Sequence, residues 1–153
     1  MSLVFVKEVI NETDCIHHIT DNLYLGNCNS RNYINKYNIS RIIEIGDEEE
    51  IKNYPGIPEN LKKLTINIPD NRDVDILEYF EDIFSFIKKD DSNVLIHCKM
   101  GTSRSVAFVI SYLIKYKNMS FEESLKLIKE KRNDNIYTKP NIGFTKILKN
   151  YQI

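Results

Sequence analysis

The sequence lacks tryptophan, any long apolar run and any excess of charge of one sign. Its 21 basic and 22 acidic side chains are interspersed and leave a net charge of −1, so nothing favours nucleic-acid binding. No apolar stretch approaches the roughly 20 residues that a transmembrane helix needs. We therefore expect neither a nucleic-acid partner nor a membrane partner.

Cysteine is also scarce, with three residues in the chain. An odd number without a secretory signal is typical of a reducing compartment, so we expect a protein of the cytoplasm or nucleus. Cys15 and Cys28 lie near His17 and His18, but their spacing matches no zinc motif, and we expect no metal and no cofactor. A disulfide from Cys98 to Cys15 or Cys28 stays open as a redox switch, because the sequence gives no geometry.

Length and composition are those of one ordinary domain. A chain of 153 residues can bury roughly two-thirds of its unfolded surface, and 42% hydrophobic with 28% charged residues is normal for a globular protein. Two segments are expected to lie outside the core. Residues 1–12 would form an N-terminal arm, or an extra edge strand because residues 3–6 are apolar. Residues 47–58 carry a run of acids and two prolines, which predicts a surface loop.

The order of strand and helix patterns predicts an α/β fold. Buried strands are predicted for three short apolar runs: residues 41–45, 64–68 and 93–97. An amphipathic helix is predicted over 73–89, and a strand–helix–strand crossover favours parallel pairing. Ser120 and Glu123 form a capping box that opens another helix, and a last helix opens at Pro140. A ligand site is expected at the carboxyl end of a central strand.

The most informative segment is residues 97–105, which reads His-Cys-Lys-Met-Gly-Thr-Ser-Arg-Ser. Apolar runs on both sides of it predict a strand, a tight loop and a helix. Such a loop gathers backbone N–H groups into an anion-binding nest with a helix N-terminus behind it. Gly101 lets the backbone bend, Arg104 can hold two oxygens of an anion, and Cys98 lies at the bottom. The segment predicts a dianion site above a nucleophilic sulfur.

This segment resembles the His-Cys-x5-Arg-Ser/Thr phosphate loop of the cysteine-dependent protein phosphatases, and its flanks resemble their small dual-specificity branch. The similarity extends from residues 19–26 to residues 141–144. It implies a single-domain cysteine-phosphatase fold, with a central, mostly parallel sheet of about five strands flanked by helices. The phosphate loop would lie between the last core strand and a helix, and residues 13–153 would form the catalytic domain.

The loop residues are expected to supply the nucleophile and to bind the phosphate. Free cysteine ionises near pH 8.5, but the nest, the helix dipole and Arg104 favour the thiolate of Cys98, which would form a phosphocysteine. The substrate oxygens would be held by the loop: Lys99, Met100, Gly101, Thr102, Ser103 and Arg104. Ser105 could donate its hydroxyl to the leaving sulfur, and it could equally satisfy a backbone group in the first helical turn.

A carboxylic acid is expected to protonate the leaving group and later to activate water. The resemblance implies an Asp after the preceding strand, about thirty residues before the cysteine, and Asp70 lies 28 positions before Cys98. Asp73 and Asp75 compete for this role, although an N-cap and a first-turn acid explain them as well.

Two further residues are expected to support the loop. The resemblance and a buried position at a strand end favour His97 as a residue that orders the loop by hydrogen bonds from behind, without carrying protons. Asn141 matches an Asn before Gly-Phe in family members, where it would buttress the phosphate loop.

The absence of tryptophan also bears on the substrate. The large tyrosine-specific relatives deepen the pocket with extra loops and a Trp-containing acid loop, and this chain has neither. The resemblance implies a shallow cleft that accepts phosphotyrosine and phosphoserine or phosphothreonine in proteins. We expect a monomer that acts in signalling on phosphoprotein substrates, with a protein kinase as a candidate partner.

Two other functions stay open. Phosphoinositide-directed relatives resemble Cys-Lys-x-Gly-Lys-x-Arg, and Lys99 fits the first lysine while Thr102 replaces the second. A catalytically silent phosphoprotein-binding module would keep the fold and typically lose the cysteine, which this chain retains as Cys98.

Overall fold

The structure, a computed structural model, describes residues 11–134 and 136–151. The strand considered for residues 3–6, and most of the expected arm, lie outside this part of the chain. The described elements follow in this order: η1 (Glu12–Asp14), β1 (Ile16–Thr20), β2 (Leu23–Gly26), η2 (Cys28–Tyr33), β3 (Ile39–Ile45), α1 (Glu48–Lys52), β4 (Lys62–Ile66), η3 (Ile76–Tyr79), α2 (Phe80–Lys88), β5 (Asn93–His97), α3 (Arg104–Lys117), α4 (Phe121–Lys131) and α5 (Ile142–Asn150).

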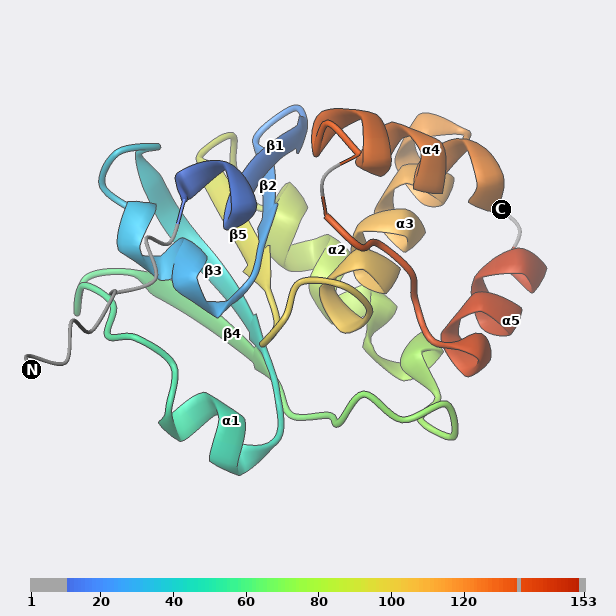
Figure 1. The fold of residues 1–153 in the computed structure, drawn as a ribbon, viewed down its shortest axis with the longest axis horizontal. Coiled ribbons are helices and arrows are strands. Elements are labelled where there is room, and N and C mark those ends of the chain that lie inside the picture. The colour runs from blue at the N-terminus through green and yellow to red at the C-terminus, as the bar shows by residue number, and fades with distance from the viewer. Residues whose placement is uncertain (1–10, 135, 152–153) are drawn as a thin grey trace, which may run out of the picture.

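A five-stranded sheet in the order β1-β2-β5-β3-β4 forms the centre of the molecule. β1 pairs with β2 antiparallel, and the pairs β2–β5, β5–β3 and β3–β4 are parallel. The expected α/β fold with a mostly parallel sheet of about five strands is confirmed. Because parallel strands end at the same edge, the carboxyl ends of β3, β4 and β5 meet at the lower face in Figure 1.

Apolar side chains cover both faces of the sheet, as its near-continuous apolar strands require. Helices α2, α3, α4 and α5 gather on one face, where the larger core includes Val94, Ile96 and Phe108 (Figure 1). A smaller cluster with Ile34, Leu95 and other buried residues covers the opposite face. β5 lies at the centre of the sheet and is buried along residues 94–97. The loop after β5 therefore starts from a rigid, central point.

Most of the predicted strands and helices are present. Some of them begin or end at other residues than predicted, because tertiary contacts change where the element stops. The strand predicted at 93–97 agrees with β5, and the capping box of Ser120 and Glu123 opens α4. The strand predicted at 64–68 is β4, which ends at Ile66 because the N–H of Ile68 donates to the carbonyl of Ile66 and turns the chain away. The helix predicted over 73–89 is a 3₁₀ turn followed by α2.

The prediction of a loop throughout 47–58 is wrong, because residues 48–52 form α1. Asp47 accepts a hydrogen bond from the N–H of Glu50, while the carboxylate of Glu50 accepts one from the N–H of Asp47. This capping box satisfies N–H groups at the helix start, and acids there also favour the helix dipole. The acidic run that indicated a loop is a helix-start signal.

The described part of the chain contains no helix with the length and apolarity to span a membrane.

Close backbone packing joins α5 to the connection between β4 and η3. A Cβ added at Gly143 would lie 1.9 Å from the carbonyl oxygen of Arg72, which no ordinary side chain adjustment relieves. The absence of a side chain at Gly143 therefore lets the first turn of α5 rest directly on the segment that carries Asp70.

We predict that Gly143→Ala lowers the free energy of unfolding by about 1–3 kcal/mol, because one of the two backbones must move. A decrease in the free energy of unfolding would be informative, because alanine in place of glycine normally stabilises a helix. Urea unfolding measures the effect, with Gly56→Ala as the control because a Cβ at Gly56 meets nothing within 4 Å. Equal stability of the two variants would contradict the backbone contact.

Candidate active site

The segment between β5 and α3 forms a compact loop at the carboxyl edge of the sheet. His97 ends β5, and α3 begins at Arg104. Gly101 has a φ of 71°, a left-handed conformation that suits glycine, and a Cβ there would lie 2.9 Å from the carbonyl oxygen of Gly26. Both observations explain why glycine stands at the centre of the loop.

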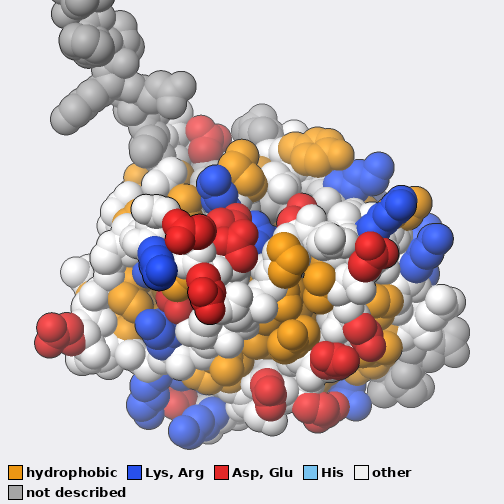
Figure 2. Space-filling view, turned by 90° about the horizontal axis from the view of Figure 1, so that it is seen from below, with side chains coloured by type: hydrophobic (Ala, Val, Ile, Leu, Met, Phe, Trp, Pro, Cys, Tyr) orange, Lys and Arg blue, Asp and Glu red, His pale blue; other side chains and the backbone are white. Residues whose placement is uncertain are grey.

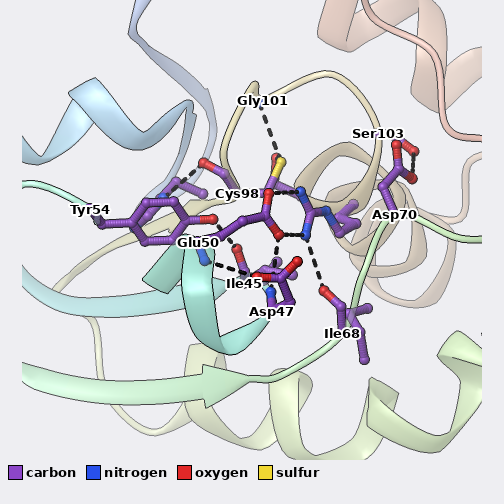
Figure 3. Close-up of polar contacts among 12 residues, drawn as sticks. Ile45, Asp47, Glu50, Tyr54, Ile68, Asp70, Cys98, Gly101 and Ser103 are labelled. Atoms are coloured by element: carbon purple, nitrogen blue, oxygen red, sulfur yellow. Dashed lines mark hydrogen bonds and ion pairs between the residues drawn. The ribbon is translucent and has the colours of Figure 1, made fainter. Parts of the chain in front are cut away.

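The sulfur of Cys98 lies at the base of this loop and is 2% exposed. The N–H of Gly101 donates to Sγ over 3.3 Å (Figure 3), and the hydroxyl of Ser105 lies 3.1 Å from Sγ. Either Cys98 or Ser105 can be the donor of the second contact. The N–H of Gly101, together with a hydroxyl of Ser105 that is able to donate, suits a thiolate, because an anion accepts more hydrogen bonds than a thiol. The structure thus brings Cys98, Gly101 and Ser105 together.

Arg104 reaches across the loop to α1, which sequence analysis did not connect with the site. Its Nη1 and Nη2 donate to the two carboxylate oxygens of Glu50 over 2.6 and 2.7 Å, and Nη1 also donates to the carbonyl of Ile68 over 3.0 Å (Figure 3). Its Nε is buried and has no hydrogen-bond partner among the described residues. This arrangement holds the guanidinium in place and leaves Nε–H for an oxyanion.

Electrostatics keep both members of this pair charged. Hydrogen bonds from Arg104 lower the pKa of Glu50 to about 2, against the opposing effect of burial. Burial works against the charge of Arg104, but the hydrogen bonds to Glu50 raise its pKa above the usual value. The side chains are 6% and 16% exposed, so water screens the pair weakly. Sequence analysis did not identify Glu50 as a site residue. The one sequence feature that could have indicated it is its position in the capping box with Asp47.

Asp70 is exposed and lies beside the loop. Its Oδ1 accepts a hydrogen bond from the hydroxyl of Ser103 over 2.7 Å (Figure 3). The same oxygen accepts a second one from the side-chain amide of Asn141 over 2.8 Å. Oδ2 has no hydrogen bond from any described residue, so it remains available to a substrate. Asp75 instead caps η3 by accepting from the N–H of Leu77. The geometry favours Asp70 as the acid.

Asn141 links three parts of the site. Its backbone N–H donates to the hydroxyl of Ser103 over 2.9 Å, and its Oδ1 caps α5 by accepting from the N–H of Phe144. Its Nδ2 holds Asp70. The residue therefore contacts both the phosphate loop and the acid, which extends the expected buttressing role.

His97 is fully buried and supports the loop from behind. Its Nδ1 lies 3.0 Å from the carbonyl of Cys98, and Nε2 accepts from Nε of Arg31 over 3.0 Å. This pattern assigns the proton to Nδ1. Burial lowers the pKa of His97 to about 4, so the ring is neutral at pH 7. Arg31 is held by Glu44 over 2.6 Å. Arg31 and Glu44 could not be predicted from local sequence patterns, because only the folded chain brings them to His97.

The remaining loop residues differ in how exposed their side chains are and in what their backbone contacts. Lys99 and Met100 are exposed, and Met100 is 65% exposed. The carbonyl of Thr102 accepts from the N–H of Lys139 over 2.8 Å, which places the segment before α5 beside the loop. The loop is therefore anchored on one side and open on the other.

The three cysteines are unpaired in the structure, so the redox switch stays a prediction. Burial raises the pKa of the Cys15 thiol and of the Cys28 thiol. The N–H of Cys28 donates to the carbonyl of Lys99 over 3.0 Å, which shows that η2 begins next to the loop. Within residues 11–134 and 136–151, no group of three or more His, Cys, Asp or Glu side chains is arranged to hold a metal ion.

We predict that Glu50→Gln weakens the binding of tungstate, an oxyanion that mimics phosphate, by about 3–10-fold and lowers the free energy of unfolding by about 1–3 kcal/mol. The reason is that the buried Arg104 loses its anionic partner. Tungstate titration and urea unfolding measure the two effects. Glu49→Gln is the control, because Glu49 lies on the same helix and is 83% exposed. Tighter tungstate binding at unchanged stability would instead show that Glu50 competes with the anion.

The comparisons with known proteins agree with this geometry. A family model described as "Dual specificity phosphatase, catalytic domain" matches residues 23–153. The chain is 31% identical over 150 residues to the protein phosphatase Slingshot homolog of Xenopus laevis, covering 94% of this chain and 21% of that protein. It is 27% identical over 143 residues to dual specificity protein phosphatase 1B of Arabidopsis thaliana, covering 90% and 81% of the two chains.

A solved structure is similar over nearly the whole fold. The crystal structure of the human tyrosine phosphatase-like serine/threonine/tyrosine-interacting protein has a TM-score of 0.83 and 28% identity, covering 90% of this chain and 95% of that chain. Four of the curated relatives are much longer proteins, of which this chain spans 28%, 21%, 34% and 14%. The match of the family model to most of the chain confirms the expected resemblance, and the chain belongs to the dual specificity phosphatase family.

Proposed function

We propose that this chain removes phosphate from phosphotyrosine and from phosphoserine or phosphothreonine in proteins, through a phosphocysteine on Cys98. The observation that carries the proposal is the arrangement around the sulfur. The N–H of Gly101 donates to Sγ, the hydroxyl of Ser105 lies 3.1 Å from it, and the buried Nε of Arg104 has no hydrogen-bond partner among the described residues. These contacts support a nucleophile beneath an oxyanion site, which the reaction requires.

The first step is an in-line attack. The thiolate of Cys98 forms a bond to phosphorus while the bond from phosphorus to the ester oxygen breaks. Backbone N–H groups of the loop and Nε of Arg104 stabilise the equatorial oxygens. Asp70, through its free Oδ2, gives its proton to the departing alkoxide or phenoxide.

The second step releases the enzyme. Asp70, now ionised, takes a proton from water as the water oxygen attacks phosphorus. The bond from sulfur to phosphorus breaks, and inorganic phosphate leaves. Ser105 stabilises the departing thiolate through its hydroxyl, which lies 3.1 Å from Sγ. Of the two roles considered for Ser105, its contact with sulfur supports this one.

The surface around the loop supports a protein substrate over a phosphoinositide. Figure 2 shows the lower face of Figure 1, where apolar side chains lie near the centre and acidic and basic side chains surround them. A cavity of about 230 Å³ beside the loop has a mostly acidic and polar lining: Cys28, Asp47, Glu49, Glu50, Asn53, Tyr54 and Lys99. Acids repel a headgroup with several phosphates.

Exposed apolar side chains near the loop also favour a polypeptide. Met100, Tyr137 and Ile142 are 65%, 72% and 57% exposed. Met100 lies in the loop, and hydrogen bonds from Lys139 and Asn141 tie the segment that carries the other two to it. Such side chains are suited to contact residues on either side of a phosphorylated residue.

The rest of the proposal follows from this substrate class. Residues 13–153 are the catalytic domain, the chain acts as a monomer without metal or other cofactor, and its substrates are phosphoproteins of signalling pathways in the cytoplasm or nucleus, with protein kinases among them.

A phosphoprotein-binding module without turnover is the second candidate. The human structural neighbour is named as a phosphatase-like and interacting protein. The retained Cys98, with Asp70 on the rim of the same loop, favours catalysis in this chain.

We predict that Cys98→Ser abolishes phosphate release from phosphotyrosine and phosphothreonine peptides, because serine is not ionised at neutral pH, while tungstate still binds. Phosphate release measured with phosphopeptides and with a soluble inositol phospholipid headgroup tests the function. A wild-type chain that binds phosphopeptides and releases no phosphate would support the binding module. Faster hydrolysis of the headgroup than of the phosphopeptides would support a phosphoinositide phosphatase.

We predict that Asp70→Asn slows the hydrolysis of alkyl phosphates about 10²–10³-fold and that of p-nitrophenyl phosphate much less, because p-nitrophenolate leaves without a proton. Steady-state rates for a phosphoserine peptide and p-nitrophenyl phosphate measure the difference. Asp73→Asn is the matched control on the same segment. Equal losses for both substrates would contradict the assignment of Asp70 as the acid.

A further inference from the structure

Arg132, the residue that follows α4, extends into the protein behind the phosphate loop. It is 2% exposed. Its Nη1 donates to the carbonyl of Gly101 over 2.6 Å and contacts Oγ1 of Thr138 at 3.3 Å. Its Nε is buried and has no hydrogen-bond partner among the described residues. The side chain thus joins α4, the loop and the segment before α5.

Among the residues that the structure describes, the charge of Arg132 has no carboxylate partner, which sets it apart from the other buried arginines. Arg31 pairs with Glu44 at 2.6 Å, Arg104 pairs with Glu50 at 2.6 Å, and Arg41 lies 3.3 Å from Asp90. In residues 11–134 and 136–151, no acidic side chain lies within 4.0 Å of Arg132. A buried charge without a partner is costly, so another anion is required to compensate it.

Cys98 is the group that can supply this anion. The titratable groups that interact electrostatically with Arg132 are the thiol of Cys98, across the loop, and the imidazole of His17 on β1. Burial lowers the pKa of His17, so that ring is neutral at pH 7 and adds no charge. Burial also lowers the pKa of Arg132 to about 10, which still leaves the guanidinium charged at neutral pH.

The hydrogen bond to Gly101 has a second effect, on the shape of the nest. In a trans peptide the C=O and the following N–H point in opposite directions. Arg132 holds the carbonyl of Gly101 on its own side of the loop, so the N–H of Thr102 is turned to the other side, where the anion binds. The preceding N–H, of Gly101 itself, already donates to Sγ.

We propose that Arg132 is a positioning residue of the phosphate loop, which stabilises the Cys98 thiolate with an uncompensated buried charge and orients the Gly101–Thr102 peptide toward the oxyanion. The consequence of this role of Arg132 for catalysis rests on the proposed function. The effects of Arg132 on the sulfur and on anion binding do not depend on turnover.

The test measures the alkylation of Cys98 by iodoacetamide as a function of pH, with the modified peptide quantified by mass spectrometry so that Cys15 and Cys28 do not interfere. In Arg132→Met we expect the midpoint of this profile to rise by about one pH unit, which makes alkylation about 10-fold slower below the midpoint. Tungstate should bind about 10-fold more weakly. Arg132→Lys keeps the charge and should recover most of the midpoint shift.

Lys131→Met is the matched control, because Lys131 is the exposed neighbour of Arg132 on α4. Arg132→Gln replaces Arg132→Met if the latter does not fold, since it removes the charge and keeps a hydrogen-bond donor. A folded Arg132→Met or Arg132→Gln chain with an unchanged midpoint would overturn the proposal, even if its melting temperature fell.

The two proposals fail separately. A wild-type chain that releases no phosphate, but whose Cys98 profile depends on Arg132, would refute the proposed phosphatase activity and support the role of Arg132. A wild-type chain that hydrolyses phosphopeptides, with the same alkylation profile of Cys98 in all Arg132 variants, would support the phosphatase activity and refute the role of Arg132.

Discussion

The burial of positive charge around one loop is the constraint on which the rest of this site depends. Arg104 and Arg132 approach the loop from different sides, and Arg31 lies behind His97. Each guanidinium is taken out of water, so each needs a carboxylate, a carbonyl or a bound anion. Glu44 and Glu50 meet this need for two of them. The positive charge that these carboxylates do not balance acts on the sulfur of Cys98 and on the space above it.

The fold explains how so many charges can be held near one point. The strands β3, β4 and β5 are parallel, so their carboxyl ends bring α1, Asp70 and the phosphate loop to one edge. The loop itself begins at the central, buried strand β5 and ends at α3, a helix with eleven buried residues. A rigid base of this kind limits how far the loop can move when an anion leaves.

Local patterns predicted much of this arrangement. The strand, loop and helix around Cys98, the capping box at Ser120 and the position of Asp70 depend on residues close together in the chain, or on spacing along it. Glu50 and Arg132 could not be predicted in the same way. Their contacts with Arg104 and Gly101 join residues 54 and 31 positions apart, which only the packed sheet and helices bring together. An acidic run and a helix-end arginine are, in sequence, ordinary surface features.

The hydroxyl of Ser103 carries a consequence for how the site is assembled. It accepts a hydrogen bond from the N–H of Asn141 and donates one to Asp70, while Asn141 also opens α5. Because one hydroxyl contacts both the carboxyl group and the start of α5, any displacement of this helix would shift the acid and the anion-binding loop together.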